Sequence, residues 1–149
     1  MKKQFDPHMH TAEHILNQTM VRMFDTGRCF SAHIERKKSK CDYRFDHPLT
    51  AEEEQQITNQ VNDVIKADLP VTERFTSLAE AKKEFDLSRL PEGSGDKIRI
   101  IAVGDYDHCP CIGPHVDSTA QIGKFRITSS SFEEGVLRIR FKLKREHRF

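Results

Sequence analysis

The order of helical and strand patterns along the chain constrains its fold more than any other feature of the sequence. Apolar residues recur every three or four positions from Met9 to Phe24, which predicts an amphipathic helix. Strand patterns follow at 29–34 and 40–45, and the polar segment 36–39 between them predicts a hairpin. Because helices and hairpins are mixed without a regular strand-helix alternation, we expect an α+β fold with a largely antiparallel sheet and a few helices packed on it.

The remainder of the sequence continues this mixed pattern. Thr50 and Ser77 each stand three residues before a glutamate, which predicts two further helix starts with capping boxes. The first of these helices should stop before Pro70, and the segment 91–95 should be a connecting loop. Because no repeat or linker divides the sequence, we expect a single domain over residues 1–149. The further strands are expected at 71–75, 97–103, 124–128 and 136–143.

The overall charge limits the kinds of partner that the chain can have. Lys and Arg number 24 and Asp and Glu number 23, so the net charge of +1 excludes a uniformly basic coat for DNA or RNA. No apolar run is long enough to cross a bilayer, and the N-terminus lacks the apolar segment of a secretory signal. We therefore expect a cytoplasmic protein, in which the four cysteines serve as thiols or metal ligands rather than in disulfides.

Two pairs of potential metal ligands lie about a hundred residues apart. His10 and His14 are four residues apart on the predicted first helix, so both imidazoles project from one face. Cys111 and His115 have the same spacing in a late segment, where Gly113-Pro114 disfavours a helix. Imidazole and thiolate are ligands that zinc prefers, so a turn that brings both pairs together would complete a four-ligand site. The sequence therefore predicts a zinc site between the first helix and a late loop.

Cys109 and Glu13 lie beside these ligands in the sequence. The four-residue spacing to His115 belongs to Cys111, so we expect Cys109 to be a small buried hydrophobic residue. Glu13 falls one position outside the histidine face, and we expect it to be solvated. His-x-x-Glu-His also matches a zinc-peptidase signature with Glu13 as general base, but that alternative leaves Cys111 and His115 without a role.

The first predicted hairpin carries polar residues on one side. Cys29, Ser31 and His33 alternate, so they could line a small polar pocket beside the first helix. An ordinary exposed strand face would show the same alternation.

Basic residues gather in two places. Along 136–144 they alternate with apolar residues, which predicts a strand with one basic face and one buried face. A second cluster lies at the tip of the first hairpin. A solvated strand face and tip would look the same, but contact with phosphates would make them a local, salt-dependent nucleic-acid footprint. The candidates for phosphate contact are Arg36, Lys37, Lys38, Lys40, Arg138, Arg140, Lys142 and Lys144.

Three segments together resemble a known family. They are His10-Thr-Ala-Glu-His14-Ile-Leu, Cys111-Ile-Gly-Pro-His115-Val and Thr119-Ala-Gln-Ile-Gly123-Lys-Phe-Arg-Ile. They look like the editing module, or second additional domain, that alanyl- and threonyl-tRNA synthetases share. The resemblance runs from His10 to about Leu143 and leaves no room for an aminoacylation domain, so the chain is most similar to the short free-standing AlaX form.

The resemblance implies a trans-editing hydrolase whose partner is mischarged tRNA, with no DNA or membrane partner. Ser-tRNA(Ala) is the first candidate substrate and Gly-tRNA(Ala) the second, and zinc at His10, His14, Cys111 and His115 would form the catalytic centre. The segment 113–116 is closer to the threonyl form of the motif, which leaves Ser-tRNA(Thr) as an alternative. Because four protein ligands are typical of structural zinc, a zinc-stabilised module that only binds tRNA or a synthetase is a further alternative.

Overall fold

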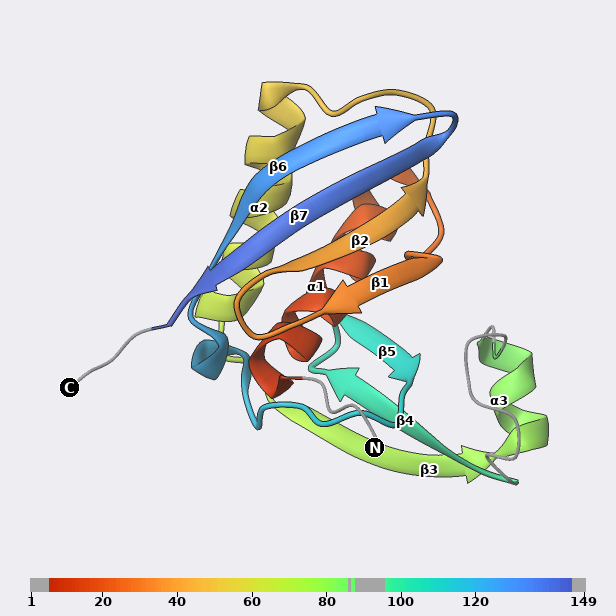
Figure 1. The fold of residues 1–149 in the computed structure, drawn as a ribbon. Helices are drawn as coiled ribbons and strands as arrows, with labels where there is room; N and C mark the ends of the chain where they lie inside the picture. Colours follow the sequence, from red (N-terminus) through yellow and green to blue (C-terminus); the bar gives the residue numbers. More distant parts are fainter. Residues whose placement is uncertain (1–5, 86, 88–95, 146–149) are drawn as a thin grey trace.

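The computed structural model describes residues 6–85, 87 and 96–145, and it shows two antiparallel sheets and three α-helices in these ranges (Figure 1). The α+β prediction is confirmed, although the strands form two sheets rather than one. The four-stranded sheet has the order β1-β2-β7-β6, and the three-stranded sheet has the order β3-β4-β5. The predicted loop at 91–95 lies outside the described residues. The strands are β1 (Ser31–Ile34), β2 (Ser39–Arg44), β3 (Val71–Ser77), β4 (Lys97–Val103), β5 (Asp107–Pro110), β6 (Lys124–Glu133) and β7 (Val136–Lys144).

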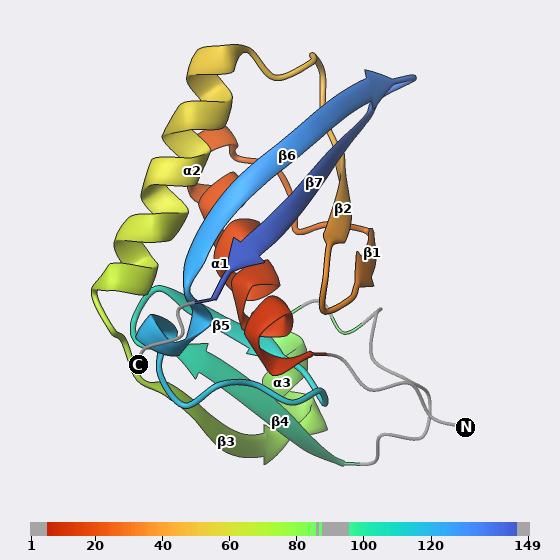
Figure 2. The same ribbon diagram turned by 60° about the vertical axis from the view of Figure 1, so that its left-hand side comes forward.

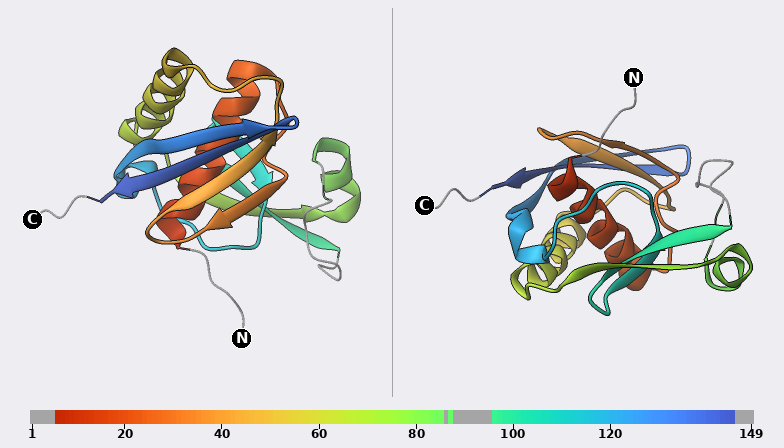
Figure 3. Two further views of the ribbon diagram at one scale, coloured as in Figure 1. Left: turned by 45° about the horizontal axis from the view of Figure 1, so that its top comes forward. Right: turned by 90° about the horizontal axis from the view of Figure 1, so that it is seen from below.

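Helix α1 (Pro7–Phe24) lies between the two sheets (Figures 2 and 3). It begins after Asp6, whose carboxylate accepts a hydrogen bond of 3.0 Å from the backbone N–H of Met9. The helix contacts β1 on one side and β5 on the other, so residues on most of its faces are buried. A buried polar side chain needs hydrogen-bond partners, so α1 organises the polar interior of the molecule. Its buried polar residues are His10, Thr11, Glu13, His14, Asn17 and Thr19.

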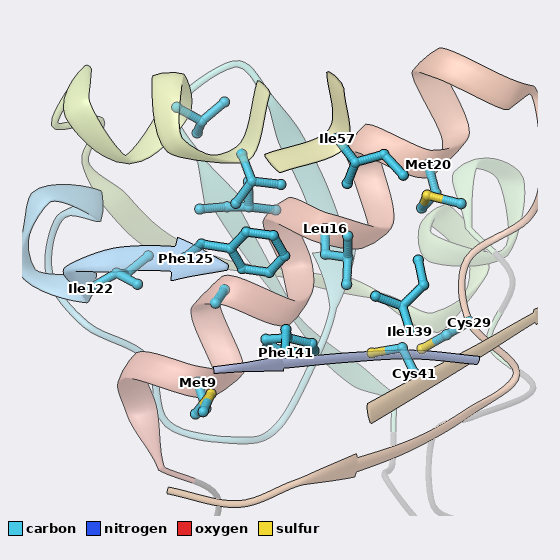
Figure 4. Packing of buried hydrophobic residues seen from close by; sticks show 14 of the residues in the cluster. Met9, Leu16, Met20, Cys29, Cys41, Ile57, Ile122, Phe125, Ile139 and Phe141 are labelled. Atoms are coloured by element: carbon cyan, nitrogen blue, oxygen red, sulfur yellow. The ribbon is translucent and has the colours of Figure 1, made fainter. Parts of the chain in front are cut away.

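Helix α2 (Ala51–Lys66) packs beside α1 and against β6. Thr50 and Glu53 form the predicted capping box, in which each side chain accepts a hydrogen bond from the backbone N–H of the other. Fully buried side chains from α1, α2 and the inner face of the four-stranded sheet, such as Leu16, Ile57 and Phe141, form the main core (Figure 4). Helix α3 (Leu78–Glu84) packs separately on β3 and β4. No helix in the described part of the chain is both long and apolar enough to cross a membrane.

Strand β5 is the main element that the sequence does not predict. Its four residues, Asp-His-Cys-Pro, lack the alternation and the β-branched side chains of a typical strand. They nevertheless pair with β4, where Cys109 lies opposite Ile101. Pro110 is the last residue of this edge strand. Proline has no backbone N–H to donate, and the end of an edge strand tolerates this. Strand β6 also continues to Glu133, beyond its predicted end at Thr128, because its serines pair with β7 after an irregularity in the register.

The short 3₁₀ helix η1 (Thr119–Ile122) joins the late loop to the core. Thr119 Oγ1 donates to the carbonyl oxygen of Val64 at 2.9 Å and accepts from the N–H of Leu69 at 2.8 Å. Gly123 follows with φ at +93°, and a Cβ atom there would lie 2.5 Å from the carbonyl oxygen of Lys144. A glycine is therefore needed where the chain turns from η1 into β6.

Candidate metal centre

The two predicted ligand pairs converge near the N-terminal end of α1. His10 Nε2 lies 3.3 Å from Cys111 Sγ, and Cys111 directly follows β5. One ligand atom from each of His10, His14, Cys111 and His115 lies within 4.8 Å of the others, so the group could hold a metal ion. The rings of His10 and His115 stack with centroids 4.3 Å apart, and His14 lies edge-on to both. The structure therefore brings all four predicted ligands to one place.

Each of the three histidines has a neighbour for its Nδ1 atom. His10 Nδ1 lies 3.1 Å from the carbonyl oxygen of Pro114, and His14 Nδ1 lies 3.4 Å from Asp107 Oδ2. A carbonyl oxygen only accepts hydrogen bonds, so His10 Nδ1 must carry a proton, and its Nε2 can be the ligand atom. His14 Nδ1 is within ion-pair distance of Asp107 but makes no hydrogen bond among the described residues. His115 Nε2 is buried without a hydrogen-bond partner among the described residues. An imidazole held at one nitrogen and available at the other is typical of a metal ligand.

Thr11 connects this centre to the helix backbone. Its buried hydroxyl donates to the carbonyl oxygen of Pro7 at 3.0 Å and accepts from the N–H of Val116 at 3.2 Å. The same oxygen lies 2.9 Å from His115 Nδ1. Because its proton already points to Pro7, the hydroxyl must accept the proton of His115. Thr11 thus orients His115 and fixes the late loop against α1.

Charges around the centre favour a thiolate at Cys111. Burial alone would raise the pKa of Cys111, but the nearby imidazoles of His10, His115 and His14 outweigh it and lower this pKa to about 3. Burial would likewise lower the pKa of His14, but the nearby acidic groups of Asp107 and Cys111 raise it to about 9. A thiolate is the form of cysteine that binds zinc, and the set of three imidazoles and one thiolate fits that metal.

Asp107 supports His14 from β5 and is itself neutralised by Arg28. Its carboxylate is buried, yet Arg28 donates hydrogen bonds of 2.7 Å and 3.2 Å to its two oxygens. Although burial would raise the pKa of Asp107, the contacts with His14 and Arg28 hold it far below its usual value. Asp107 therefore remains ionised and can orient His14 through Nδ1. No local pattern points to Asp107, because the residues of β5 lack the alternation of a predicted strand.

The late part of the chain, residues 98–140, matches the family model described as the threonyl and alanyl tRNA synthetase second additional domain. The chain is 34% identical over 133 residues to an alanine–tRNA ligase from Treponema denticola, covering 88% of this chain and 22% of the ligase. With the ligase from Bacillus subtilis the identity is 35% over 123 residues, covering 82% of this chain and 14% of the ligase. Residues 98–140 therefore belong to this second-additional-domain family, and most of the chain is similar to alanine–tRNA ligases. The chain spans less than a quarter of the length of these two ligases.

The burial of Glu13 differs from its prediction. It is buried rather than solvated, with 7% of its surface exposed. Its Oε1 lies 3.7 Å from His10 Nε2, and its Oε2 accepts a hydrogen bond of 3.4 Å from Cys29 Sγ. The prediction was wrong because α1 is covered by elements on both sides, so a position outside the histidine face does not reach solvent.

Cys109 lies outside the ligand group, as predicted, although it is half-buried rather than fully buried. Burial is the main cause that raises the pKa of its thiol to about 12, so Cys109 stays protonated in the metal-free protein.

The structure does not form the predicted pocket of Cys29, Ser31 and His33, because the last two residues do not face α1. Ser31 and His33 are exposed and pair with Asp42 and Lys40 on the outer face of the four-stranded sheet, away from α1. Cys29 precedes β1 and is buried in the core. The chain bends at Phe30, so the alternation of a strand does not extend back to Cys29.

The outer face of the four-stranded sheet is basic, as the alternation along β7 predicted. Leu137, Ile139 and Phe141 are fully buried, whereas the basic residues between them face outward. Lys40 pairs with Arg140 and Arg126 pairs with Lys142, so neighbouring strands add to the same face. Lys124 and Arg126 on β6 were not predicted to belong to this face, although the same alternation at the start of that strand indicates it. The predicted hairpin-tip residues Arg36, Lys37 and Lys38 are exposed in the β1–β2 loop.

Arg138 is different from the other basic residues of this face. It donates hydrogen bonds of 2.8 Å and 3.0 Å to the two carboxylate oxygens of Asp42. Its charge is therefore already balanced within the protein, and it is less available for a phosphate than Arg140, Lys142 or Lys144.

Proposed function

We propose that this domain hydrolyses the ester bond of mischarged aminoacyl-tRNA, with Ser-tRNA(Ala) and Gly-tRNA(Ala) as substrates. The convergence of His10, His14, Cys111 and His115 in a chain whose residues 98–140 belong to this family is the observation that carries the proposal. The similarity to alanine–tRNA ligases over most of the chain favours tRNA(Ala) over tRNA(Thr). We further propose that residues 1–149 act as a single editing domain.

Pocket chemistry gives a reason for this activity. A site that accepts alanine cannot strongly reject an amino acid that merely adds a hydroxyl, and it discriminates against serine by only about 100-fold. A second hydrolytic site removes the errors that remain. An aminoacyl ester is a reactive substrate, so positioning and modest polarisation of its carbonyl can suffice.

The four converging residues would hold zinc, which when bound supplies a Lewis acid that can polarise the ester carbonyl. The chain's own contribution is orientation. Pro114, Asp107 and Thr11 fix the three rings, and the late loop carries Cys111 and His115 to α1. Four protein ligands usually make a closed site, so hydrolysis requires that one ligand yields or that the metal shapes the pocket without acting directly.

The basic outer face would contact the tRNA backbone. Arg140, Lys142 and Lys144 lie on β7 with Lys40 beside them on β2. Phosphate contacts release counterions, so binding should weaken steeply as salt increases. Substitution of Arg140 and Lys142 by alanine should reduce this salt dependence, whereas an affinity that does not change with salt would contradict the role of this face.

A deacylation panel tests the proposed function. Ser-tRNA(Ala), Gly-tRNA(Ala) and Ser-tRNA(Thr) are each incubated with metal-free protein, zinc-loaded protein and His115→Ala. We expect zinc-loaded protein to cleave the first two substrates and the other two preparations to be strongly impaired. His108→Ala is a matched control because it removes an exposed imidazole from the three-stranded sheet, away from the basic outer face. Cleavage of Ser-tRNA(Thr) alone would favour the threonyl alternative, and full activity of metal-free protein would exclude a role for zinc.

A non-catalytic zinc-stabilised binding module is the second candidate, because a set of four protein ligands favours structural zinc. In that case the protein would bind tRNA or a synthetase but cleave no substrate of the panel. A zinc peptidase is disfavoured, because its signature needs only the residues of α1, whereas Cys111 and His115 join the same group here.

A further inference from the structure

Glu13 is a buried carboxylate next to the candidate metal centre. Its side chain is 9% exposed, and it lies on α1 between His10 and His14. Oε1 is 3.7 Å from His10 Nε2, the same atom that approaches Cys111 Sγ. Oε2 receives hydrogen bonds from Cys29 Sγ at 3.4 Å and from Asn17 Nδ2 at 3.5 Å. Its carboxylate thus borders the same space as the converging ligands.

The partners of Glu13 differ from those of the other buried acids. In the described part of the chain, the buried acidic residues are Glu13, Asp42 and Asp107. Asp42 receives two hydrogen bonds from Arg138, and Asp107 receives two from Arg28. Among the described residues, no arginine or lysine lies within 4.0 Å of Glu13; its ion-pair partner is His10, and Arg28 acts on it only from a greater distance. A buried carboxylate that lacks a strong cation is costly, so a cationic group of a ligand would stabilise it.

The proposed substrate supplies one suitable cation. An aminoacyl ester carries an α-ammonium group on the carbon next to the scissile carbonyl. If Glu13 binds this ammonium group, the scissile carbonyl of the ester would lie beside the four candidate metal ligands, because His10 is three residues before Glu13 on α1. We propose that Glu13 binds the α-ammonium group of the esterified amino acid, an inference that rests on the proposed function. Glu13 is a substrate-binding residue that selects free aminoacyl esters over esters whose amine is missing or acylated.

A second metal ion is the competing occupant. Glu13, Cys29 and Cys41 also place ligand atoms within 4.8 Å of one another, and the two cysteines lie side by side in the core (Figure 4). Hydrogen bonding with Cys29 and burial raise the pKa of Cys41 well above its usual value. Cys41 is therefore protonated in the metal-free protein, and a second metal bound there would have to displace this proton.

The test compares Glu13→Gln with wild type, using pairs of ligands that differ only at the α position. One pair consists of seryl-tRNA(Ala) and its deaminated α-hydroxy analogue, for which kcat/KM is measured. The other pair consists of seryl-adenosine and its α-hydroxy analogue, both with a non-hydrolysable amide in place of the ester. For this pair the dissociation constant is measured. Glutamine keeps the size and hydrogen bonding of the side chain and removes only its charge. Glu52→Gln, an exposed acid on α2, is the control.

We expect wild type and Glu52→Gln to prefer the amino compound in both pairs. In Glu13→Gln this preference should fall by about 10- to 100-fold, the worth of a charge-assisted hydrogen bond, while the α-hydroxy compounds behave as with wild type. Equal losses on both members of a pair, or no loss, would overturn the role of Glu13 alone. Two zinc ions per wild-type chain and one in Glu13→Gln would overturn it in favour of a second metal. A wild type that cleaves no ester would refute the proposed function and the role of Glu13 together.

Discussion

Thr11→Val tests whether the metal centre depends on a hydroxyl that is not itself a ligand. Valine keeps the shape of the side chain but cannot accept the hydrogen bonds from His115 Nδ1 and from the backbone N–H of Val116. A buried donor that loses its partner costs about 1–3 kcal/mol, and loss of such a support typically weakens metal affinity by about 10- to 100-fold. We therefore expect the zinc dissociation constant to rise by about that factor. The metal-free protein should lose about 2 kcal/mol of its free energy of unfolding.

Competition with a coloured chelator measures the zinc affinity, and urea denaturation of the metal-free protein measures the stability. Thr11→Ser restores the hydroxyl and should recover most of the affinity. Thr19→Val is the matched control, because Thr19 is equally buried on the same helix but its hydroxyl bonds to Ile15 and Tyr106. It should lower stability and leave zinc affinity unchanged. If Thr11→Val holds zinc as tightly as Thr19→Val, the hydroxyl does not orient His115 and the reasoning is wrong.

Three further predictions concern the whole domain. Removal of zinc by a chelator should lower the melting temperature, since metal binding is linked to folding, and an unchanged melting curve would show that the ligands bind no metal. Gly123→Ala should lower the free energy of unfolding by about 1–3 kcal/mol in urea denaturation, because its φ is positive and a Cβ atom would collide with the carbonyl oxygen of Lys144. Gly135→Ala is the comparison for the effect of φ alone, because Gly135 also has a positive φ but a Cβ atom there meets no atom within 4 Å. Hydrogen bonds from Arg138 lower the pKa of Asp42 below its usual 3.8, so its contribution should be present above that pH and vanish as the pH falls through the lowered value. Asp42→Asn should therefore cost up to about 1 kcal/mol at neutral pH and progressively less in acid; a loss that is the same at both would contradict the pairing.

The ligand pairs could be predicted because their evidence is local. Four residues make about one helical turn, so His10 and His14 must share a face of α1 wherever the helix lies. The same holds for the alternation on β7, which places basic and buried residues on opposite faces in any sheet. Zinc chemistry then links His10 and His14 to Cys111 and His115, although no local rule specifies how the chain brings them together.

The supporting residues could not be predicted, because they depend on how layers pack. Glu13 is buried because the segment before β1 and strand β2 cover its side of α1, where Cys29 and Cys41 lie beside its carboxylate. Asp107 reaches His14 from β5, a strand whose own sequence favours a turn and which is held by pairing with β4. Ser31 and His33 followed the rule of alternation correctly, but the bend at Phe30 separates them from Cys29.

The wide spacing of the two ligand pairs along the chain has a consequence for synthesis on the ribosome. The first pair emerges near the start of α1, and the second emerges only after both helices of the core and all three strands of the β3-β4-β5 sheet. A nascent chain therefore cannot close the centre until most of the domain has been translated. Any property that depends on the complete ligand group would therefore be delayed until His115 has left the ribosome.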